Sequence, residues 1–146
     1  MGDEGLASDL DLDYLPRLGR KTDDGIGAIG AGFIMRDARL EAYRQAGFRV
    51  VAIASRQPEH AQEIAARYGI PRVHGEWRAL LADPEVEIVD SAFPPHEQPL
   101  IVRAAARHAG RIRGILAQKP LAPTLTEVAE MVWLVRSLDR VKKGAV

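Results

Sequence analysis

A glycine-rich stretch at residues 26–35 contains the first residues whose types and spacing could do chemistry. It reads Ile-Gly-Ala-Ile-Gly-Ala-Gly-Phe-Ile-Met, which predicts a short apolar strand, a glycine turn and the start of a helix. Such a turn presents backbone N–H groups and a helix N-terminus to a pyrophosphate. Gly30 would allow the tight turn and Gly32 the close approach of the phosphates, whereas Met35 occupies the third position of the G-x-G-x-x-G/A fingerprint. The residues predicted to bind a dinucleotide here are Gly30, Ala31, Gly32, Phe33 and Ile34.

A second frame of the same fingerprint, Gly25-Ile-Gly27-Ala-Ile-Gly30, also matches letter by letter. The fingerprint must follow a strand, and the preceding Lys-Thr-Asp-Asp at residues 21–24 is not one. We therefore prefer the first frame. An ordinary strand-to-helix turn without a ligand remains the alternative for either.

The loop after the second predicted strand reads Ser55-Arg56-Gln57, and no acid occurs between Glu41 and Glu59. A site for NAD usually has an Asp or Glu at this point, which binds the ribose hydroxyls. Sites for FAD and S-adenosylmethionine generally contain the same acid. An arginine and a hydroxyl would instead accept a 2′-phosphate. Ser55 and Arg56 therefore favour NADP over NAD, the alternative being a surface arginine beside a helix start.

Two further loops follow predicted strands. One contains Pro94, Pro95 and His96, and its prolines would stiffen a loop bordering the nicotinamide. The other contains Gln118 and Lys119, and a lysine at the carboxyl end of a strand could polarise a carbonyl or hold a hydroxyl. The four histidines share no spacing typical of metal ligands, so no metal site is predicted.

Strands and helices alternate along the chain and must position these loops. In the first helix Ile34, Ala38, Ala42 and Ala46 are spaced four apart on one side. The alternation predicts an α/β fold with a doubly wound parallel sheet of about five strands, in which ligands bind beyond the carboxyl ends of the strands. Strands are predicted near 26–29, 48–54, 72–74, 86–93 and 114–117, and helices near 33–46, 58–68, 77–81, 101–108 and after the capping box Thr124–Glu127.

Composition narrows the possible classes of protein. The 146 residues carry 20 basic and 20 acidic side chains, so no net field attracts nucleic acid or an anionic membrane. The absence of cysteine fits a reducing compartment, and the N-terminus lacks the pattern of a signal peptide, so a cytoplasmic location is expected. Residues 1–24 are predicted to be an extension, 25–123 the binding domain, and 124–146 a final helix and truncated end. Possible anchors of the extension are Leu10, Leu12, Tyr14 and Leu15.

From about Ile26 to Val135 the sequence resembles the N-terminal domain of the Gfo/Idh/MocA oxidoreductases. The resemblance implies a Rossmann-type domain that binds NAD or NADP for hydride transfer to or from sugars, cyclitols and related hydroxy compounds. It implies that Lys119 is the catalytic residue near the nicotinamide and the substrate, with Pro94, Pro95 and Gln118 also bordering the cofactor. It rests on Ile29-Gly30-Ala31-Gly32, on Val51-Ala52-Ile53-Ala54-Ser55-Arg56, on Leu81-Ala82-Asp83-Pro84-Glu85-Val86, on Pro94-Pro95 and on Lys119-Pro120-Leu121-Ala122.

The sequence also departs from this family. Gln118 replaces the glutamate of the Glu-Lys-Pro hallmark, and Gln98 occupies a position where the family often has histidine. Family members continue into a C-terminal α/β substrate domain, whereas this sequence stops at Val146. We therefore expect an enzyme that is incomplete in this chain, with no turnover by itself and with surface that favours homo-oligomers or self-association. A non-catalytic nucleotide-binding or regulatory module is the alternative, and a bare α/β domain without a ligand is a third.

Overall fold

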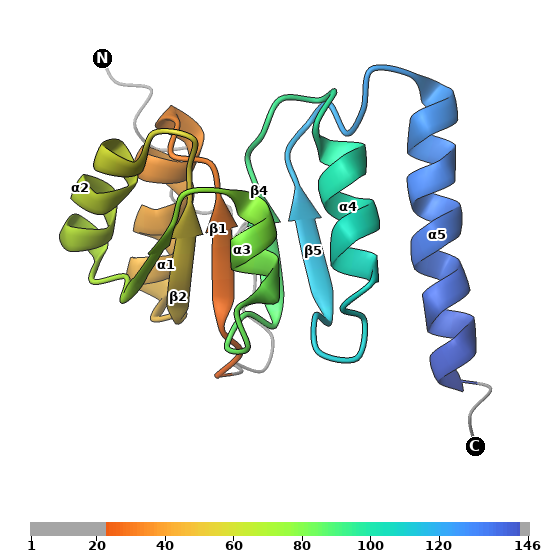
Figure 1. The fold of residues 1–146 in the computed structure, drawn as a ribbon, viewed down its shortest axis with the longest axis horizontal. Helices are drawn as coiled ribbons and strands as arrows, with labels where there is room; N and C mark the ends of the chain where they lie inside the picture. Colours follow the sequence, from red (N-terminus) through yellow and green to blue (C-terminus); the bar gives the residue numbers. More distant parts are fainter. Residues whose placement is uncertain (1–22, 144–146) are drawn as a thin grey trace, which may run out of the picture.

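Five parallel strands form one sheet in the order β3-β2-β1-β4-β5 (Figure 1). The computed structural model describes the backbone of residues 23–143 and the side chains of residues 23–138, so the predicted anchors in the N-terminal extension lie outside the described residues. The strand order and the parallel pairing confirm the predicted doubly wound sheet. Strands β2 and β4 are shorter than predicted. The strands are β1 (Ile26–Ile29), β2 (Val50–Ala54), β3 (Arg72–His74), β4 (Ile88–Ser91) and β5 (Gly114–Ala117).

Helices connect the strands, and most begin or end where local signals predict, but α4 spans Gln98–Ala106 and so begins and ends earlier than the predicted 101–108. Pro58 opens α2, where its missing N–H costs no hydrogen bond, and Gly47 and Gly69 end α1 and α2 with φ of 69° and 66°. Thr124 Oγ1 accepts a 3.3 Å hydrogen bond from the Glu127 amide before α5. The helices are η1 (Ile34–Arg39), α1 (Leu40–Ala46), α2 (Pro58–Tyr68), α3 (Trp77–Ala82), α4 (Gln98–Ala106) and α5 (Leu125–Lys143).

The buried face of the first helix is not the face that its sequence spacing predicts. Ile34, Ala38 and Ala42 are exposed, whereas Met35 and Leu40 are buried against α2 and the sheet. The reason is that residues 34–39 form a π-helix, whose i→i+5 hydrogen bonds place residues five apart on one side. The apolar spacing of four therefore identified the wrong face of this helix.

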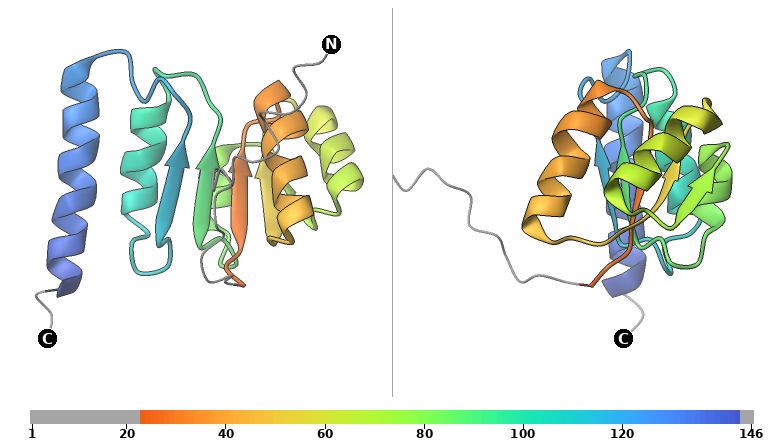
Figure 2. Two further views of the ribbon diagram at one scale, coloured as in Figure 1. Left: turned by 180° about the vertical axis from the view of Figure 1, so that it is seen from behind. Right: turned by 90° about the vertical axis from the view of Figure 1, so that its left-hand side faces the viewer.

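Helices cover both faces of the sheet. Ala28 and Ile53 face η1, α1 and α2, and Val51 and Val89 face α3 and α4 on the other side. Figure 2 shows the first helices on one side of the sheet and α3 and α4 on the other. Because the chain leaves β1 toward one face and β4 toward the other, a crevice forms between the ends of these neighbouring strands.

The glycines of the rejected fingerprint frame serve packing. A Cβ added to Gly25 would lie 1.9 Å from the carbonyl oxygen of Glu85, and one added to Gly27 would lie 2.7 Å from Cδ2 of Leu80. Both positions therefore require glycine because neighbouring chain segments approach β1 closely. Gly25 and Gly27 thus have a packing role, and the choice of the frame that begins at Gly30 stays a prediction.

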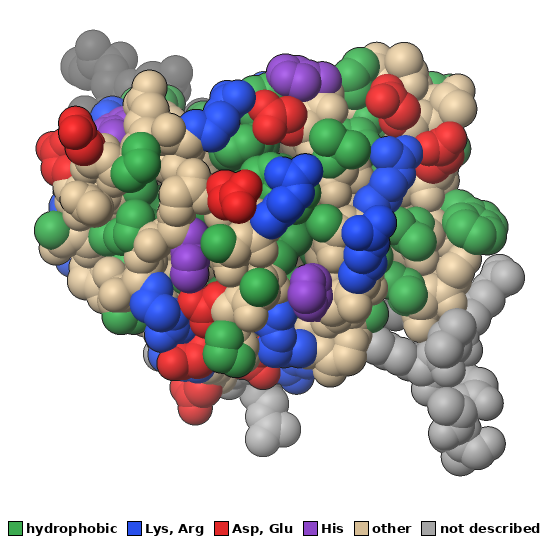
Figure 3. Space-filling model, viewed as in Figure 1, with side chains coloured by type: hydrophobic (Ala, Val, Ile, Leu, Met, Phe, Trp, Pro, Cys, Tyr) green, Lys and Arg blue, Asp and Glu red, His purple; other side chains and the backbone are tan. Residues whose placement is uncertain are grey.

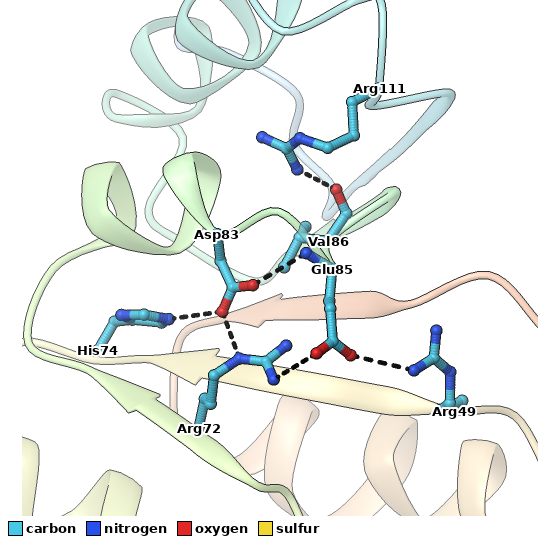
Figure 4. A network of polar contacts seen from close by, with 7 residues as sticks. All are labelled: Arg49, Arg72, His74, Asp83, Glu85, Val86 and Arg111. Atoms are coloured by element: carbon cyan, nitrogen blue, oxygen red, sulfur yellow. Dashed lines mark hydrogen bonds and ion pairs between the residues drawn. The ribbon is translucent and has the colours of Figure 1, made fainter.

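A polar network ties β3 to the loop between α3 and β4 (Figure 4). Asp83 is 6% exposed, and its Oδ2 accepts hydrogen bonds from Arg72 at 2.6 Å and pairs with His74 at 3.1 Å. Its Oδ1 accepts the Glu85 amide at 3.0 Å. Burial alone would raise the pKa of Asp83, but the hydrogen bonds from Arg72, the Glu85 amide and His74 outweigh it and lower that pKa. The Asp-Pro-Glu-Val segment thus anchors the start of β4, and Arg111 donates to the carbonyls of Val86 and Leu81.

Helix α5 packs on α4 at one end of the molecule (Figure 1). Met131 is buried against Val102 and Ala122, and Arg103 pairs with Glu130 at 2.6 Å. Among the described residues, no helix has the length and hydropathy needed to cross a bilayer.

Candidate functional site

A cavity of about 390 Å³ lies at the carboxyl ends of β1, β2 and β4. It is lined by the glycine turn, the loop after β2, the first turn of α2 and the loop after β4. Figure 3 shows basic, acidic and histidine side chains along the upper edge of the molecule, where the strands of Figure 1 end, as well as over the rest of this face. The cavity lining contains Arg56 and His60 and no carboxylate, and an arginine in such a lining can pair with an anionic group of a ligand.

Gly30 makes the turn that opens the crevice. Its φ of +106° is accessible to glycine, and a Cβ there would lie 2.8 Å from the carbonyl oxygen of Ala92. Its N–H donates to the carbonyl of Ala54 at 2.8 Å, which joins the turn to β2. A Cβ added to Gly32 would meet open space, so the backbone at this position is accessible from the cavity side.

The amides that follow the turn are available to a ligand. Arg36 makes the first hydrogen bond of the helix, to the carbonyl of Gly32 at 2.9 Å. In the part of the chain that the structure describes, the N–H groups of Ala31, Gly32, Phe33 and Ile34 have no acceptor. A run of unpaired amides at a helix N-terminus, with the positive end of the helix dipole, is suited to phosphate oxygens.

The helix after the turn is fixed to the sheet by a buried ion pair. Asp90 of β4 is fully buried and pairs with Arg39 of η1, and it accepts a 2.6 Å hydrogen bond from the Tyr43 hydroxyl. Burial raises the pKa of Tyr43, and the positive charge of Arg39 opposes that rise. These contacts fix η1 and α1 to the sheet, and Arg39, Tyr43 and Asp90 are not among the residues that line the cavity.

Arg56 reaches across the crevice. Its guanidinium lies over the Phe93 ring, 5.3 Å from the centroid, and its NH1 atom is 3.1 Å from Oε1 of Glu97. Ser55 is buried, and its Oγ accepts a 3.1 Å hydrogen bond from the backbone N–H of Gln57. Among the described residues no acceptor takes the hydroxyl proton of Ser55, which leaves that proton available to a ligand acceptor.

The loop after β5 presents Lys119 at the surface. The residues on either side of Lys119 are held by Gln98, which is 1% exposed and whose Nε2 donates to the carbonyls of Gln118 and Pro120 at 2.5 and 2.9 Å. The backbone N–H of Gln118 donates to the backbone carbonyl of Ser91 at 2.9 Å. The Lys119–Pro120 peptide is cis. Gln98 thus joins the start of α4 to the Lys-Pro turn.

The structure brings together some of the predicted site residues and separates others. Phe33 and Ile34 are exposed beside the cavity, and Pro95, Gln118 and Lys119 are not among its lining residues. The predicted residues that line it are Gly30, Ala31, Gly32, Ser55, Arg56 and Pro94. Those that the sequence analysis did not assign to the site are Gln57, His60, Ala92 and Phe93.

Two signals could have found these four residues. Ala92 and Phe93 directly follow β4, the strand next to β1, and Gln57 and His60 lie in the cap and first turn of α2. Any residue at the carboxyl end of a strand next to the glycine turn is a candidate for the crevice. Within the described residues no group of three or more His, Cys, Asp or Glu could hold a metal ion.

The fold and the crevice define a Rossmann-type dinucleotide-binding domain. A family model described as "Oxidoreductase family, NAD-binding Rossmann fold" matches residues 25–143. The chain therefore belongs to the Gfo/Idh/MocA oxidoreductases, as the sequence resemblance predicted.

Relatives and solved structures agree with this assignment. The chain is 34% identical over 113 residues to trans-1,2-dihydrobenzene-1,2-diol dehydrogenase of Oryctolagus cuniculus, covering 75% of this chain and 33% of that protein. It is similar to an oxidoreductase from Agrobacterium radiobacter in complex with NAD+, L-tartaric acid and magnesium, with a TM-score of 0.73 and 29% identity over 81% of this chain and 34% of that one.

A third similar structure binds the other cofactor. It is a 3-ketoreductase from Actinomadura kijaniata in complex with TDP-benzene and NADP, with a TM-score of 0.71 and 28% identity over 80% of this chain and 36% of that one. The chain thus spans about a third of the length of the relatives it matches. Similar structures carry NAD or NADP, so membership of the family leaves the choice between the two cofactors open.

Proposed function

We propose that this chain binds NADP in preference to NAD and serves an oxidoreductase that transfers hydride to or from a sugar, cyclitol or related hydroxy compound. The observation that carries this proposal is the set of four unpaired amides, from Ala31 to Ile34, beside a cavity that contains Arg56 and no carboxylate. The amides suit a pyrophosphate, and Arg56 suits a 2′-phosphate, which a carboxylate at the same place would repel. Ser55 supports the same contact through its hydroxyl.

The cofactor preference has a definite expected size. A well-formed arginine–phosphate contact contributes on the order of 1.5–3 kcal/mol, so NADPH should bind roughly tenfold or more tightly than NADH. Fluorescence titration of the purified chain with each cofactor measures the two dissociation constants. Arg56→Glu should erase or reverse the preference, because it replaces the attracting charge with a repelling one. Equal constants in the unaltered chain would contradict the proposed preference.

We further propose that Lys119 acts at the reacting carbon, where its ammonium group would polarise a carbonyl. What supports a role apart from cofactor affinity is that Lys119 is exposed and is not among the cavity-lining residues. Lys119→Ala should therefore leave the NADPH dissociation constant within about twofold of its original value, whereas Arg56→Glu should not. A tenfold loss of NADPH affinity in Lys119→Ala would assign Lys119 to cofactor binding instead.

A further inference from the structure

The pair formed by Arg56 and Glu97 crosses the proposed cofactor crevice. Arg56 lies two residues beyond β2, and Glu97 lies beyond β4 at the N-cap of α4. Strands β2 and β4 are the two neighbours of β1, one on each side. An ion pair between these loops therefore passes over the end of β1, where the glycine turn begins.

Glu97 holds Arg56 from outside the cavity. Arg56 and Phe93 both line the cavity, but Glu97 is not among its lining residues. The carboxylate of Glu97 is 20% exposed and meets the guanidinium at 3.1 Å, whereas Arg56 itself is 68% exposed. The arginine that would receive a 2′-phosphate is thus already paired with an anion supplied by the protein.

The position of Glu97 is fixed by its backbone. Its amide donates to the Pro94 carbonyl at 3.0 Å, and its own carbonyl accepts the amides of Leu100 and Ile101 as α4 begins. The next residue, Gln98, is buried and bonded to the Lys-Pro turn. The glutamate is therefore an anion on a rigid support, while the exposed arginine is the partner that can move. His96 lies 3.7 Å from the same carboxylate.

We infer that Glu97 is a specificity-determining residue, which weakens NADP binding by competing with the 2′-phosphate for Arg56 and so sets the ratio of NADP to NAD affinity. This inference rests on the proposed function of the cavity. A phosphate and a carboxylate bind the guanidinium through the same fork of N–H groups, so a 2′-phosphate must displace Glu97 or bind beside its negative charge. NAD lacks that phosphate and can bind without breaking the pair.

The test compares NADPH and NADH dissociation constants for the full chain and its variants. Glu97→Gln keeps the size of the side chain and removes its charge. It should tighten NADPH binding by about two- to fivefold, the range of an exposed ion pair, and leave NADH within twofold. The double variant Glu97→Gln, Arg56→Gln should have the same NADPH affinity as Arg56→Gln alone. Without Arg56 there is no guanidinium for which Glu97 and the 2′-phosphate compete.

Two further variants distinguish the effect of the Arg56–Glu97 ion pair from the general effect of removing a negative charge near Arg56. Glu59→Gln removes a charge three residues from Arg56 in sequence, and among the described residues Glu59 makes no ion pair, so it is the matched control and should change NADPH affinity less than Glu97→Gln does. Glu97→Asp keeps the charge but shortens the reach by one methylene group. It should tighten NADPH binding by less than Glu97→Gln. It also tests the proposal if the glutamine variant unfolds.

Several outcomes would overturn the inference. An unchanged ratio of NADPH to NADH affinity in Glu97→Gln would show that Glu97 does not compete for Arg56. A selective loss of NADH affinity would show that Glu97 instead accepts a hydrogen bond from a ribose hydroxyl. If the unaltered chain binds neither cofactor, the proposed function fails and this inference fails with it. If the unaltered chain binds NADPH and only the Glu97 variants behave otherwise than expected, the inference alone fails.

Discussion

The centre of the sheet and its β5 edge differ in how completely the described residues bury their apolar side chains. Around β1 and β2 nearly every strand residue is buried, and Leu80 and Ile53 are 0% exposed. At the β5 edge, Leu116 of β5 is 47% exposed and Trp133 of α5 is 70% exposed. Figure 3 shows hydrophobic side chains reaching the surface at the α5 end. The half of the domain that forms the cavity is thus internally packed, whereas the β5–α5 half presents apolar surface of the kind that another chain or domain covers.

The largest expected effect is a difference in stability between the centre of the sheet and its β5 edge. Leu80→Ala should lower the free energy of unfolding by about 2–5 kcal/mol, because it removes fully buried methyl groups and leaves a cavity between α3 and β1. Leu116→Ala should lower it by less than about 1 kcal/mol, since half of that side chain already meets water. Urea unfolding followed by circular dichroism measures both. Similar losses in the two variants would show that the β5 end is packed as tightly as the core.

A second effect concerns the buried anion that stabilises the packed half. Asp83→Asn should lower the free energy of unfolding near neutral pH by about 1–3 kcal/mol, because Arg72 and His74 lose a charged acceptor. The pKa of Asp83 is lower in the folded protein than in the unfolded chain, so its contribution is present above the unfolded value of about 3.9 and is lost as the pH falls through the folded pKa. The gap between original and variant should therefore close in acid.

Unfolding free energies measured from neutral pH down to acid pH test this sign. Glu76→Gln is the control, because Glu76 is exposed and its side chain makes no hydrogen bond or ion pair among the described residues. It should change stability by less than about 0.5 kcal/mol at neutral pH. A gap for Asp83→Asn that widens as the pH falls would contradict the assignment of Asp83 as a stabilised anion.

The smallest expected effect on stability, and the one that most sharpens the comparison, is at Trp133. Trp133→Ser should change the free energy of unfolding by less than about 0.5 kcal/mol, because the indole is largely in solvent. It should nevertheless reduce self-association, since it removes a large part of the exposed apolar surface on α5. Sedimentation velocity over a range of protein concentrations measures the association.

The matched control for that experiment is Phe33→Ser at the cavity end. Phe33 is 68% exposed, close to the value for Trp133, but it lies by the glycine turn and not on α5. If the apolar surface at the α5 end drives association, only the tryptophan variant should weaken it. Equal effects of the two variants, or an unaltered chain that is monomeric at every concentration, would contradict this interpretation.

Local signals in the sequence were sufficient for most of the architecture. Strand β1 at Ile26–Ile29 and strand β5 at Gly114–Ala117 have the predicted bounds, and Gly47 and Gly69 end their helices as predicted. These features depend on side-chain periodicity and on the conformational freedom of glycine, which are properties of a few adjacent residues. The alternation of strands and helices then fixed a parallel sheet and the place of the crevice, because crossovers between parallel strands are right-handed. The family could be predicted because its motifs occur one after another, in the expected order, along this sequence.

Only the tertiary structure decided which side of the first helix is buried and how the site residues pair. The π-helical turn moved burial to Met35 and Leu40, which no regular spacing of 3.6 residues would select. Gln98 and Glu97 are adjacent in sequence, yet one is buried beneath the Lys-Pro turn and the other reaches Arg56 across the crevice. Contacts between loops that are some 20 to 40 residues apart depend on how strands β2, β4 and β5 are placed side by side. The sequence by itself determined the elements and the class of site, and the packing of the elements determined which side chains meet there.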